Sequence, residues 1–456
     1  MREHLGSRLG FILLSAGCAI GIGNVWKFPY VAGQNGGGLF VLIYLFFLIV
    51  MGIPIMVMEF SVGRASQKSP AKMYQALEPP NTKWHHHSKL AIAGNYLLMM
   101  FYTTIAGWMI YYFFATAKGD IASRNPEQIA DYFNGVQQNP IITVLFMAIT
   151  VIIGILVCSL GLKNGLERVT KVMMTALIII MLILAVNSIF LEGSEKGIKF
   201  YLLPNIENIK KTGLANVIVA AMNQAFFTLS LGIGSMAIFG SYIDKKRSLM
   251  SESINIAFLD TFVAFTSGLI IFPACFAYGV DVSSGPSLIF ITLPNIFNNI
   301  PMGRLWGSLF FVFMSFAALS TVLAVFENII SCTMELFNWK RKKACIINAV
   351  LLFLLSLPCA LGFNILSGIH PFGGSSTIMD AEDFLVSNIL LPIGSLTFVL
   401  FCTRKKGWGW DNFTEEANTG KGIKVKKYMK GYCSYVLPVM ILIVFIIGLV
   451  NFVNNL

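Results

Sequence analysis

The sequence predicts an all-α polytopic membrane protein with 11 transmembrane helices and two inverted five-helix repeats, in which helices 1 and 6 are broken at mid-membrane. Three observations support this fold class. The 456-residue chain is 56% hydrophobic and only 12% charged, with a mean hydropathy of +0.73. Apolar runs of about 20 residues, long enough to span a bilayer, recur along the chain. Glycines and polar side chains interrupt two of these runs at matching positions.

The eleven spans are separated by polar or Gly- and Pro-containing connections. The first apolar run has no clear cleavage site and is followed by ten others, so it is expected to be retained as a span. The spans are expected near residues 8–32, 38–62, 90–115, 141–160, 169–190, 215–240, 252–279, 305–334, 344–362, 383–402 and 433–453.

The basic residues are distributed unevenly between the predicted loops. The net charge is +11, but most of the 33 Lys and Arg residues fall on the side of the membrane that holds the N-terminus. Because cytoplasmic loops carry the excess of Lys and Arg, the N-terminus is expected in the cytoplasm. Eleven spans then place the C-terminus outside the cell. The charge thus reflects orientation in a lipid bilayer, and no nucleic-acid partner is expected.

The first span contains an unusual stretch at mid-depth. Gly17, Gly21 and Gly23 fall within seven residues, and Asn24 and Lys27 follow them. Glycine weakens a helix by about 1 kcal/mol relative to alanine, and irregular backbone survives in a membrane only where it is buried in protein or lines a cavity. The stretch indicates a broken helix that holds an ion and a substrate. A small-xxx-small packing face explains the glycines about equally well.

A second interrupted helix lies in span six. The segment 223–234 combines polar side chains with paired glycines at Gly232 and Gly234. Span one opens the first set of five spans (8–190) and span six opens the second (215–402), while 433–453 stands alone. Interrupted helices at matching positions of two halves are typical of an inverted-repeat transporter with a site at the midplane.

Ionisable residues inside the predicted spans are candidate functional groups, because each costs about 2.5–3.5 kcal/mol at the bilayer centre on insertion scales. For Glu59 and Glu327, a buried structural hydrogen bond is an equally good explanation. Ser320 and Thr321 suit a sodium ion, although hydroxyls in membrane helices also bond their own backbone. The acids in question are Glu59, Asp260, Glu327 and Asp383, with Asp380 near a span end.

Several distinctive motifs are distributed along the whole length of the chain. They are Arg2-Glu3-His4, Gly21-Ile22-Gly23-Asn24, Phe28-Pro29-Tyr30, Gln34-Asn35-Gly36-Gly37-Gly38, Gly52-Ile53-Pro54 and the segment from Gln224 to Gly234. Together they resemble the neurotransmitter:sodium symporter family, most closely its bacterial leucine, tyrosine and multi-hydrophobic amino-acid transporters. The resemblance implies one transporter domain, 1–456, in the bacterial cell (inner) membrane. It also implies a monomer or weak dimer.

The resemblance implies two sodium ions, bound by oxygen atoms. The first site is expected to use Ala19, Asn24, Thr228 and Asp260, together with the carboxylate of the substrate. The second is expected to use the carbonyls of Gly17, Ile20 and Ala317 and the hydroxyls of Ser320 and Thr321. Half-helix dipoles favour this polarity, because helix C-termini attract cations and N-termini attract anions.

The resemblance also places the substrate. Its carboxylate would meet the amides of Ile22 and Gly23 and the Tyr102 hydroxyl, and its amine would meet carbonyls of Ala19, Phe227 and Thr228 and the Ser230 hydroxyl. Monoamine carriers have an Asp at the position of Gly21, so glycine there implies an α-amino acid. The side-chain pocket is expected to be apolar, with Leu98, Phe227, Ile233, Thr321 and Val325.

Two gates are implied on either side of this site. Lys27 and Asp383 would form the outer charged pair. Arg2 and Glu335 would close the inner side near Ser241 and Tyr242. The chain departs from the family pattern at Lys27, where most members have Arg, and at Glu335, where the family has Asp. It departs again at Thr175, where many members have a helix-breaking Pro ten residues after Gly165.

The expected function is therefore sodium-coupled import of neutral, hydrophobic L-amino acids, aromatic ones included, by alternating access. Chloride independence is expected because Asp260 replaces a neutral Asn beside the first sodium site, so a fixed carboxylate supplies the negative charge. An amino-acid sensor or a channel on the same fold is the alternative. An enzyme is not expected, because the sequence has no paired acid–base or metal-spaced cluster.

Overall fold

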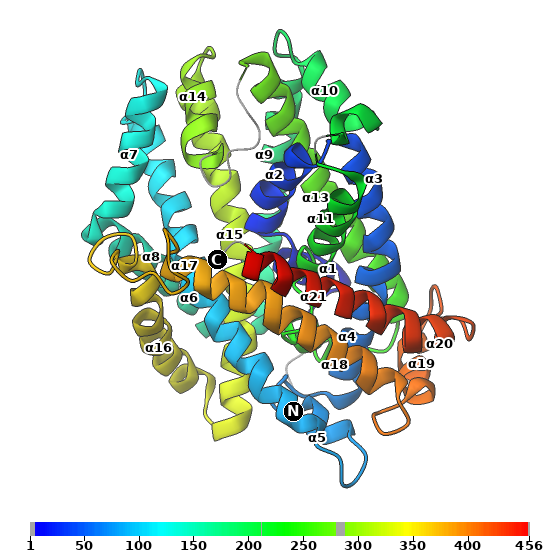
Figure 1. Ribbon diagram of the computed structural model, residues 1–456. Helices are drawn as coiled ribbons and strands as arrows, with labels where there is room; N and C mark the ends of the chain where they lie inside the picture. Colours follow the sequence, from blue (N-terminus) through cyan, green and yellow to red (C-terminus); the bar gives the residue numbers. More distant parts are fainter. Residues whose placement is uncertain (1–4, 211, 280–287, 455–456) are drawn as a thin grey trace.

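The structure is a computed structural model that describes residues 5–210, 212–279 and 288–454 (Figure 1). These residues form helices and connections, and the bridge between Arg247 and Lys421 is the isolated β-pairing within them. The all-α prediction is therefore confirmed for the described part of the chain.

Nine helical stretches among the described residues are long and apolar enough to cross a membrane, and a bent pair would make ten. The sixth predicted span is divided into two helices that are each too short for this test, so the count of eleven stays a prediction. The long stretches are Gly38–Ser66, Trp84–Lys118, Pro140–Ser159, Leu162–Ile189, Leu249–Ala277, Gly303–Phe337, Arg341–Leu361, Ile378–Thr403 and Met429–Val453.

The helices follow one another with short connections. The first half contains α1 (Arg8–Ala19), η1 (Gly23–Lys27), α2 (Phe28–Gln34), α3 (Gly38–Phe47), η2 (Leu48–Gly52), α4 (Ile53–Ser66), α5 (Met73–Leu77), η3 (Trp84–His86), α6 (His87–Lys118), α7 (Pro126–Gln138), α8 (Pro140–Ser159), η4 (Leu162–Glu167), α9 (Arg168–Ile189), α10 (Glu195–Leu202) and η5 (Ile206–Ile209). The second half contains α11 (Leu214–Phe227), α12 (Ser235–Gly240), α13 (Leu249–Ala277), η6 (Leu288–Thr292), α14 (Leu293–Asn298), α15 (Gly303–Phe337), α16 (Arg341–Leu361), α17 (Ile378–Phe384), η7 (Leu385–Leu390), α18 (Leu391–Thr403), α19 (Trp410–Asn418), α20 (Met429–Gly431), η8 (Tyr432–Val436) and α21 (Leu437–Asn454).

Both expected breaks are present. The chain bends by 59° between α1 and the helical stretch Gly23–Gln34, with Ile20 in an extended conformation after α1 ends. Seven residues separate α11 from α12. Within them Ser230, Gly232 and Gly234 all have positive φ angles of 49°, 102° and 78°. This left-handed backbone suits glycine and stops the helix from continuing.

Helix α15 lies at the core of the bundle and α21 lies at its edge. The most apolar stretch of α15 is 83% buried, against 22% for α21. Exposed large apolar side chains occur on peripheral helices such as α8, α9 and α16, as expected where helices face lipid rather than protein. All eight cysteines are free thiols, and all are buried.

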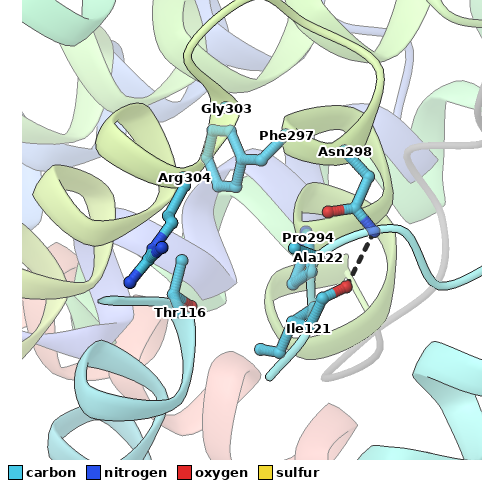
Figure 2. Close-up of a pocket in the computed structure, with 8 residues that line it drawn as sticks. All are labelled: Thr116, Ile121, Ala122, Pro294, Phe297, Asn298, Gly303 and Arg304. Carbon is cyan, nitrogen blue, oxygen red and sulfur yellow. Dashed lines mark hydrogen bonds between the residues drawn. The ribbon is translucent and has the colours of Figure 1, made fainter. Parts of the chain in front are cut away.

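Helices α7, α10 and α14 lie at one end of the bundle, and α5, α19 and α20 lie at the other (Figure 1). At the first end, the side-chain amide of Asn298, the last residue of α14, donates to the carbonyls of Ile121 (2.9 Å) and Arg124 (3.1 Å). Figure 2 shows the small cavity beside this contact, also lined by Arg304. Its volume of about 20 Å³ is the size of a water molecule. The two hydrogen bonds tie the end of α14 to the connection between α6 and α7. The cavity itself is too small for an organic substrate.

At the opposite end, the connection between α18 and α21 is tied to α4. Arg64 is fully buried and its Nε lies 2.6 Å from the carboxylate of Glu416 on α19. Lys245 approaches the other carboxylate oxygen of Glu416 at 2.9 Å. Because a buried charge needs a partner, this pair holds α19 against the end of α4.

Candidate functional site

The two helix breaks meet in the interior, where α6, α13 and α15 surround them. The amide of Gln224 donates to the carbonyl of Gly23 (3.4 Å), which joins the last turn of α11 to η1. The hydroxyl of Ser230 lies 3.5 Å from the carbonyl of Cys18 and joins the second break to the end of α1. The site can thus be described as clusters of oxygen atoms around two unwound segments.

The first cluster joins η1, the second break and α13. The Asn24 side-chain amide donates to the Asp260 carboxylate (2.8 Å) and to the Thr228 hydroxyl (3.1 Å). The Thr228 hydroxyl in turn donates to the other Asp260 oxygen (3.0 Å). Asn24 and Asp260 are fully buried, and Ala19 at the end of α1 is 4% exposed. The Asn24 oxygen accepts from the Gly21 amide (3.2 Å), so the NH2 group of this side chain is the part that faces the other two residues. The Asp260 carboxylate and the Thr228 hydroxyl that converge here are hard oxygen donors of the kind that suits sodium.

The second cluster joins α1 to α15. The Ser320 hydroxyl donates to the carbonyls of Ile20 (3.0 Å) and Ala317 (2.9 Å). The Thr321 hydroxyl lies 3.4 Å from the carbonyls of Gly17 and Ile20. All five groups predicted for the second sodium ion therefore lie together. The Ile20 carbonyl reaches both hydroxyls because α1 ends there and leaves its last carbonyls without intrahelical donors.

The predicted substrate groups lie beside the first break. The Ile22 amide donates to the Tyr102 hydroxyl at 3.0 Å. The packing around Gly21 is very tight, because a Cβ atom there would lie 2.4 Å from the Tyr102 hydroxyl and 2.6 Å from Thr321 Oγ1. At Gly23 a Cβ would lie 3.0 Å from the Phe227 ring. Of the predicted pocket side chains, Leu98, Ile233, Thr321 and Val325 are buried and Phe227 is partly buried.

A cavity of about 270 Å³ lies next to this region, lined by Lys27, Gln34, Asn223 and Phe227 among others. The Lys27 ammonium lies 3.7 Å from the centre of the Phe227 ring, a cation–π contact. Asp383 accepts a hydrogen bond from Ser387 (2.7 Å). Among the described residues no ion pair joins Lys27 to Asp383, so the structure differs from the expected outer gate. The aromatic face, rather than the carboxylate, is the partner of the lysine here.

The predicted inner gate is seen in part. Arg2 lies outside the described residues. Glu335 accepts hydrogen bonds from the amide (3.0 Å) and the hydroxyl (2.7 Å) of Ser69. Ser241 donates to the carbonyl of Ile238 (2.5 Å). The Tyr242 hydroxyl donates to the Glu327 carboxylate (2.8 Å). The three described residues thus lie at the ends of α12 and α15.

Structural partners account for the two acids that the sequence left ambiguous. Glu327 forms a two-pronged ion pair with Arg341 at the start of α16, with distances of 2.7 and 3.0 Å. Fork-to-fork geometry of this kind is the strong form of an ion pair. Glu59 accepts from the backbone amides of Gly232 (2.9 Å) and Met236 (3.0 Å) at the second break. Arg341 lies just before a predicted span, and its charge alone did not reveal its partner.

Sequence reasoning also missed three buried polar residues. Asn95 and Asn328 are at most 1% exposed and hydrogen-bonded to each other across α6 and α15 (2.9 Å). Glu382 is 5% exposed, immediately before Asp383. An amide in the apolar run of α6 was the available signal for Asn95, whereas the span was predicted to begin after Glu382. No group of three or more His, Cys, Asp or Glu side chains that could hold a metal ion occurs within the described ranges.

A bundle of apolar helices with two unwound segments and oxygen clusters between them defines a membrane transporter. A model of the sodium:neurotransmitter symporter family matches residues 2–130 and 127–456. The chain belongs to this family, so it is a sodium-dependent symporter and not an enzyme.

Individual relatives agree with this assignment. The chain is 36% identical to an uncharacterised sodium-dependent transporter of Bacillus subtilis, YhdH, over 98% of both chains. It is 31% identical to an uncharacterised sodium-dependent transporter of Methanocaldococcus jannaschii, over 96% of this chain and 89% of the relative. The crystal structure of MhsT in complex with L-phenylalanine superposes with a TM-score of 0.87 and 36% identity, covering 98% of this chain and 99% of MhsT.

Proposed function

We propose that the protein imports neutral, hydrophobic L-amino acids, aromatic ones included, together with sodium and independently of chloride, by alternating access. The observation that carries this proposal is the meeting of both helix breaks with the Asn24–Thr228–Asp260 cluster. Unwound backbone in a membrane protein exposes carbonyls and amides that a soluble ligand can use.

Two sodium ions are bound in this proposal. The first ion is held by Ala19, Asn24, Thr228 and Asp260, and the second by Gly17, Ile20, Ala317, Ser320 and Thr321. The hydrogen bonds within each cluster support these assignments, because they bring side chains or backbone carbonyls from several elements next to one another. Bound sodium ions would replace these internal hydrogen bonds, and their coordination would fix the position of α1 relative to α13 and α15.

The substrate carries the carboxylate that this chain lacks at Gly21. Its carboxylate is placed at the Ile22 and Gly23 amides and the Tyr102 hydroxyl, and its amine at Ala19, Phe227, Thr228 and Ser230. The remaining lining of Leu98, Ile233, Thr321 and Val325 is largely apolar, so an apolar substrate side chain is favoured. The MhsT structure contains L-phenylalanine, which supports an aromatic or large aliphatic substrate for this chain.

Chloride independence follows from the charge of Asp260. The groups that would surround a chloride ion are Tyr44, Gln224, Thr228, Asp260 and Ala264. Tyr44 and Gln224 are both buried, and Tyr44 lies near Asp260. Two negative charges in such a place repel by several kcal/mol even at an effective dielectric constant of about 20. An ionised Asp260 and a chloride ion therefore exclude each other.

The proposal includes the wider architecture. In this proposal the protein has 11 spans, with inverted repeats over 8–190 and 215–402 and an additional helix at 433–453. It lies in a bacterial inner membrane with the N-terminus inside and the C-terminus outside. Lys27 and Asp383 form the outer gate when the 270 Å³ cavity closes. Arg2, Glu335, Ser241 and Tyr242 form the inner gate. The protein works as a monomer or weak dimer.

The test is uptake into proteoliposomes that contain the purified protein. An inward sodium gradient should drive accumulation of leucine, methionine, phenylalanine, tyrosine or tryptophan, and potassium or choline should abolish it. Replacing chloride by gluconate should leave native uptake unchanged, and Asp260→Asn should be impaired or chloride-sensitive. Accumulation that survives the removal of sodium would overturn the coupling, and native uptake that collapses in gluconate would overturn chloride independence.

A further inference from the structure

A buried asparagine holds the backbone of the second helix break. The side-chain amide of Asn95 on α6 donates to the carbonyl of Ile233 at 2.8 Å. Its second amide hydrogen donates to the Ala91 carbonyl of its own helix at 2.7 Å. Asn95 is 1% exposed. The contact joins a continuous helix to the segment that separates α11 from α12.

The backbone on either side of Ile233 is inherently free to rotate. Gly232 and Gly234 have positive φ angles of 102° and 78°, in a region that glycine enters at little cost. Two flanking glycines leave the orientation of the intervening residue to its contacts. For the Ile233 carbonyl, Asn95 supplies that contact.

The side chain of Ile233 packs against the same turn of α6. A Cβ atom at Gly94 would lie 2.8 Å from Cγ2 of Ile233, so the isoleucine occupies the space that glycine leaves. Leu98, which belongs to the proposed substrate pocket, lies one turn further along α6 on the Asn95 side. The carbonyl and the side chain of Ile233 are therefore both positioned by residues of a single helical turn next to the pocket.

A second asparagine fixes the first. Asn328 on α15 is fully buried and donates its side-chain amide to the Asn95 oxygen at 2.9 Å. With this bond both amide hydrogens of Asn95 donate and its oxygen accepts, so any rotation of the side chain would break at least one hydrogen bond. Fully satisfied polar networks in a low-dielectric interior hold one geometry strongly, because any broken bond leaves a buried group unpaired.

We propose that Asn95, held by Asn328, is a positioning residue that fixes Ile233 in the second helix break and thereby sets the size of the substrate side chain that the transporter accepts. The inference rests on the proposed amino-acid transport function. It adds to that function a specificity determinant outside the pocket, which acts through the backbone of Ile233.

The experiment compares three alanine variants of buried asparagines in the uptake assay: Asn95→Ala, Asn328→Ala and Asn348→Ala. Asn348 is the matched control, because it is fully buried and bonded to Thr333 (2.9 Å) and Tyr96 (2.5 Å) but has no bond to the break. The readout is the ratio of kcat/KM for tryptophan to kcat/KM for leucine, with KM and kcat reported separately.

Asn95→Ala should shift this ratio by about tenfold toward tryptophan, mainly through KM, because a released Ile233 makes room for a larger ring. Asn328→Ala should shift it in the same direction by less, since the Asn95–Ile233 bond remains. Asn348→Ala should leave the ratio unchanged even where it lowers stability.

The proposal is overturned if Asn95→Ala transports with the native ratio, or if Asn348→Ala shifts the ratio equally. If Asn95→Ala does not fold, Asn328→Ala decides in the same way. Failure of the native protein to take up any amino acid with sodium would instead refute the proposed function itself. These two failures are distinguishable because the first is a ratio measured in an active transporter.

Discussion

The carboxylate of Glu59 accepts a hydrogen bond of 2.9 Å from the backbone amide of Gly232. Its other oxygen accepts from Met236 at the first turn of α12 (3.0 Å). The first amides of a helix have no intrahelical acceptor, and the N-terminal end carries a partial positive charge. Glu59, which lies on α4, therefore supplies hydrogen-bond acceptors to backbone amides at the second break. Its negative charge also offsets the partial positive charge at the start of α12.

Replacing Glu59 with glutamine should disable the transporter. Glutamine keeps one acceptor oxygen but places an amide group against a backbone N–H that then has no acceptor. Each lost hydrogen bond to a charged group costs about 1.5–3 kcal/mol. The melting temperature and the affinity of sodium-dependent substrate binding, both measured in detergent, should be lower for Glu59→Gln than for the native protein. Native binding affinity in this variant would contradict the assigned role.

Gly21→Ala should weaken substrate binding strongly. The new methyl group would lie 2.4 Å from the Tyr102 hydroxyl and 2.6 Å from Thr321 Oγ1, so both groups must move. Overpacking of this kind costs about 1–3 kcal/mol. Substrate titration should show a weaker Kd. Gly135→Ala on α7 is the control, because a Cβ there meets nothing within 4 Å, and it should bind like the native protein.

Thr175→Pro should loosen the start of α9. The helix runs without interruption from Arg168 to Ile189, and Gly165 lies in the preceding η4 segment. Proline removes one backbone donor and clashes with the carbonyl of Lys171, four residues earlier, at a cost of about 3 kcal/mol. Amide hydrogen exchange in the peptide 168–175 should become faster than in the native chain. Unchanged exchange there would show that the helix tolerates proline at this position.

Glu382→Gln should leave stability unchanged or raise it. Neither oxygen of this buried carboxylate has a hydrogen-bond partner of good geometry among the described residues, and the Cys359 thiol that faces it is a weak donor. A neutral amide avoids the cost of burying a charge. Melting temperature is the measurement, and a lower value for Glu382→Gln would reject the argument.

Asp380→Asn, two residues earlier, supplies the contrast for that experiment. Asp380 accepts hydrogen bonds from the amide and the hydroxyl of Thr377 (2.8 Å each), which forms the cap at the start of α17. Asparagine retains only part of this cap, and loss of a cap costs about 1 kcal/mol. Asp380→Asn should therefore lower the melting temperature while Glu382→Gln does not.

The sequence was informative wherever one local pattern determined the outcome. Apolar run length located the membrane helices to within a few residues, and clustered glycines located both breaks. The adjacent hydroxyls of Ser320 and Thr321 marked them as candidate cation ligands, and in the structure both hydroxyls contact carbonyls at the end of α1.

Contacts between distant elements were harder to predict. Lys27 lies over the ring of Phe227, 200 residues along the chain, although a carboxylate was the expected partner. The pairing of Asn95 with Asn328 depends on how α6 and α15 pack, and neither helix reveals this register by itself. Long-range side-chain pairs require the relative rotation and depth of two helices, which hydropathy leaves undetermined.

All eight cysteines are buried, so labelling of the native thiols can report conformational changes that expose them to solvent. Cys18 precedes Ala19 at the end of α1, and its thiol is 0% exposed. A water-soluble maleimide can alkylate this sulfur only while the first break is open to solvent. The rate of labelling at Cys18 therefore measures how often the centre of the protein becomes hydrated, without an introduced reporter group.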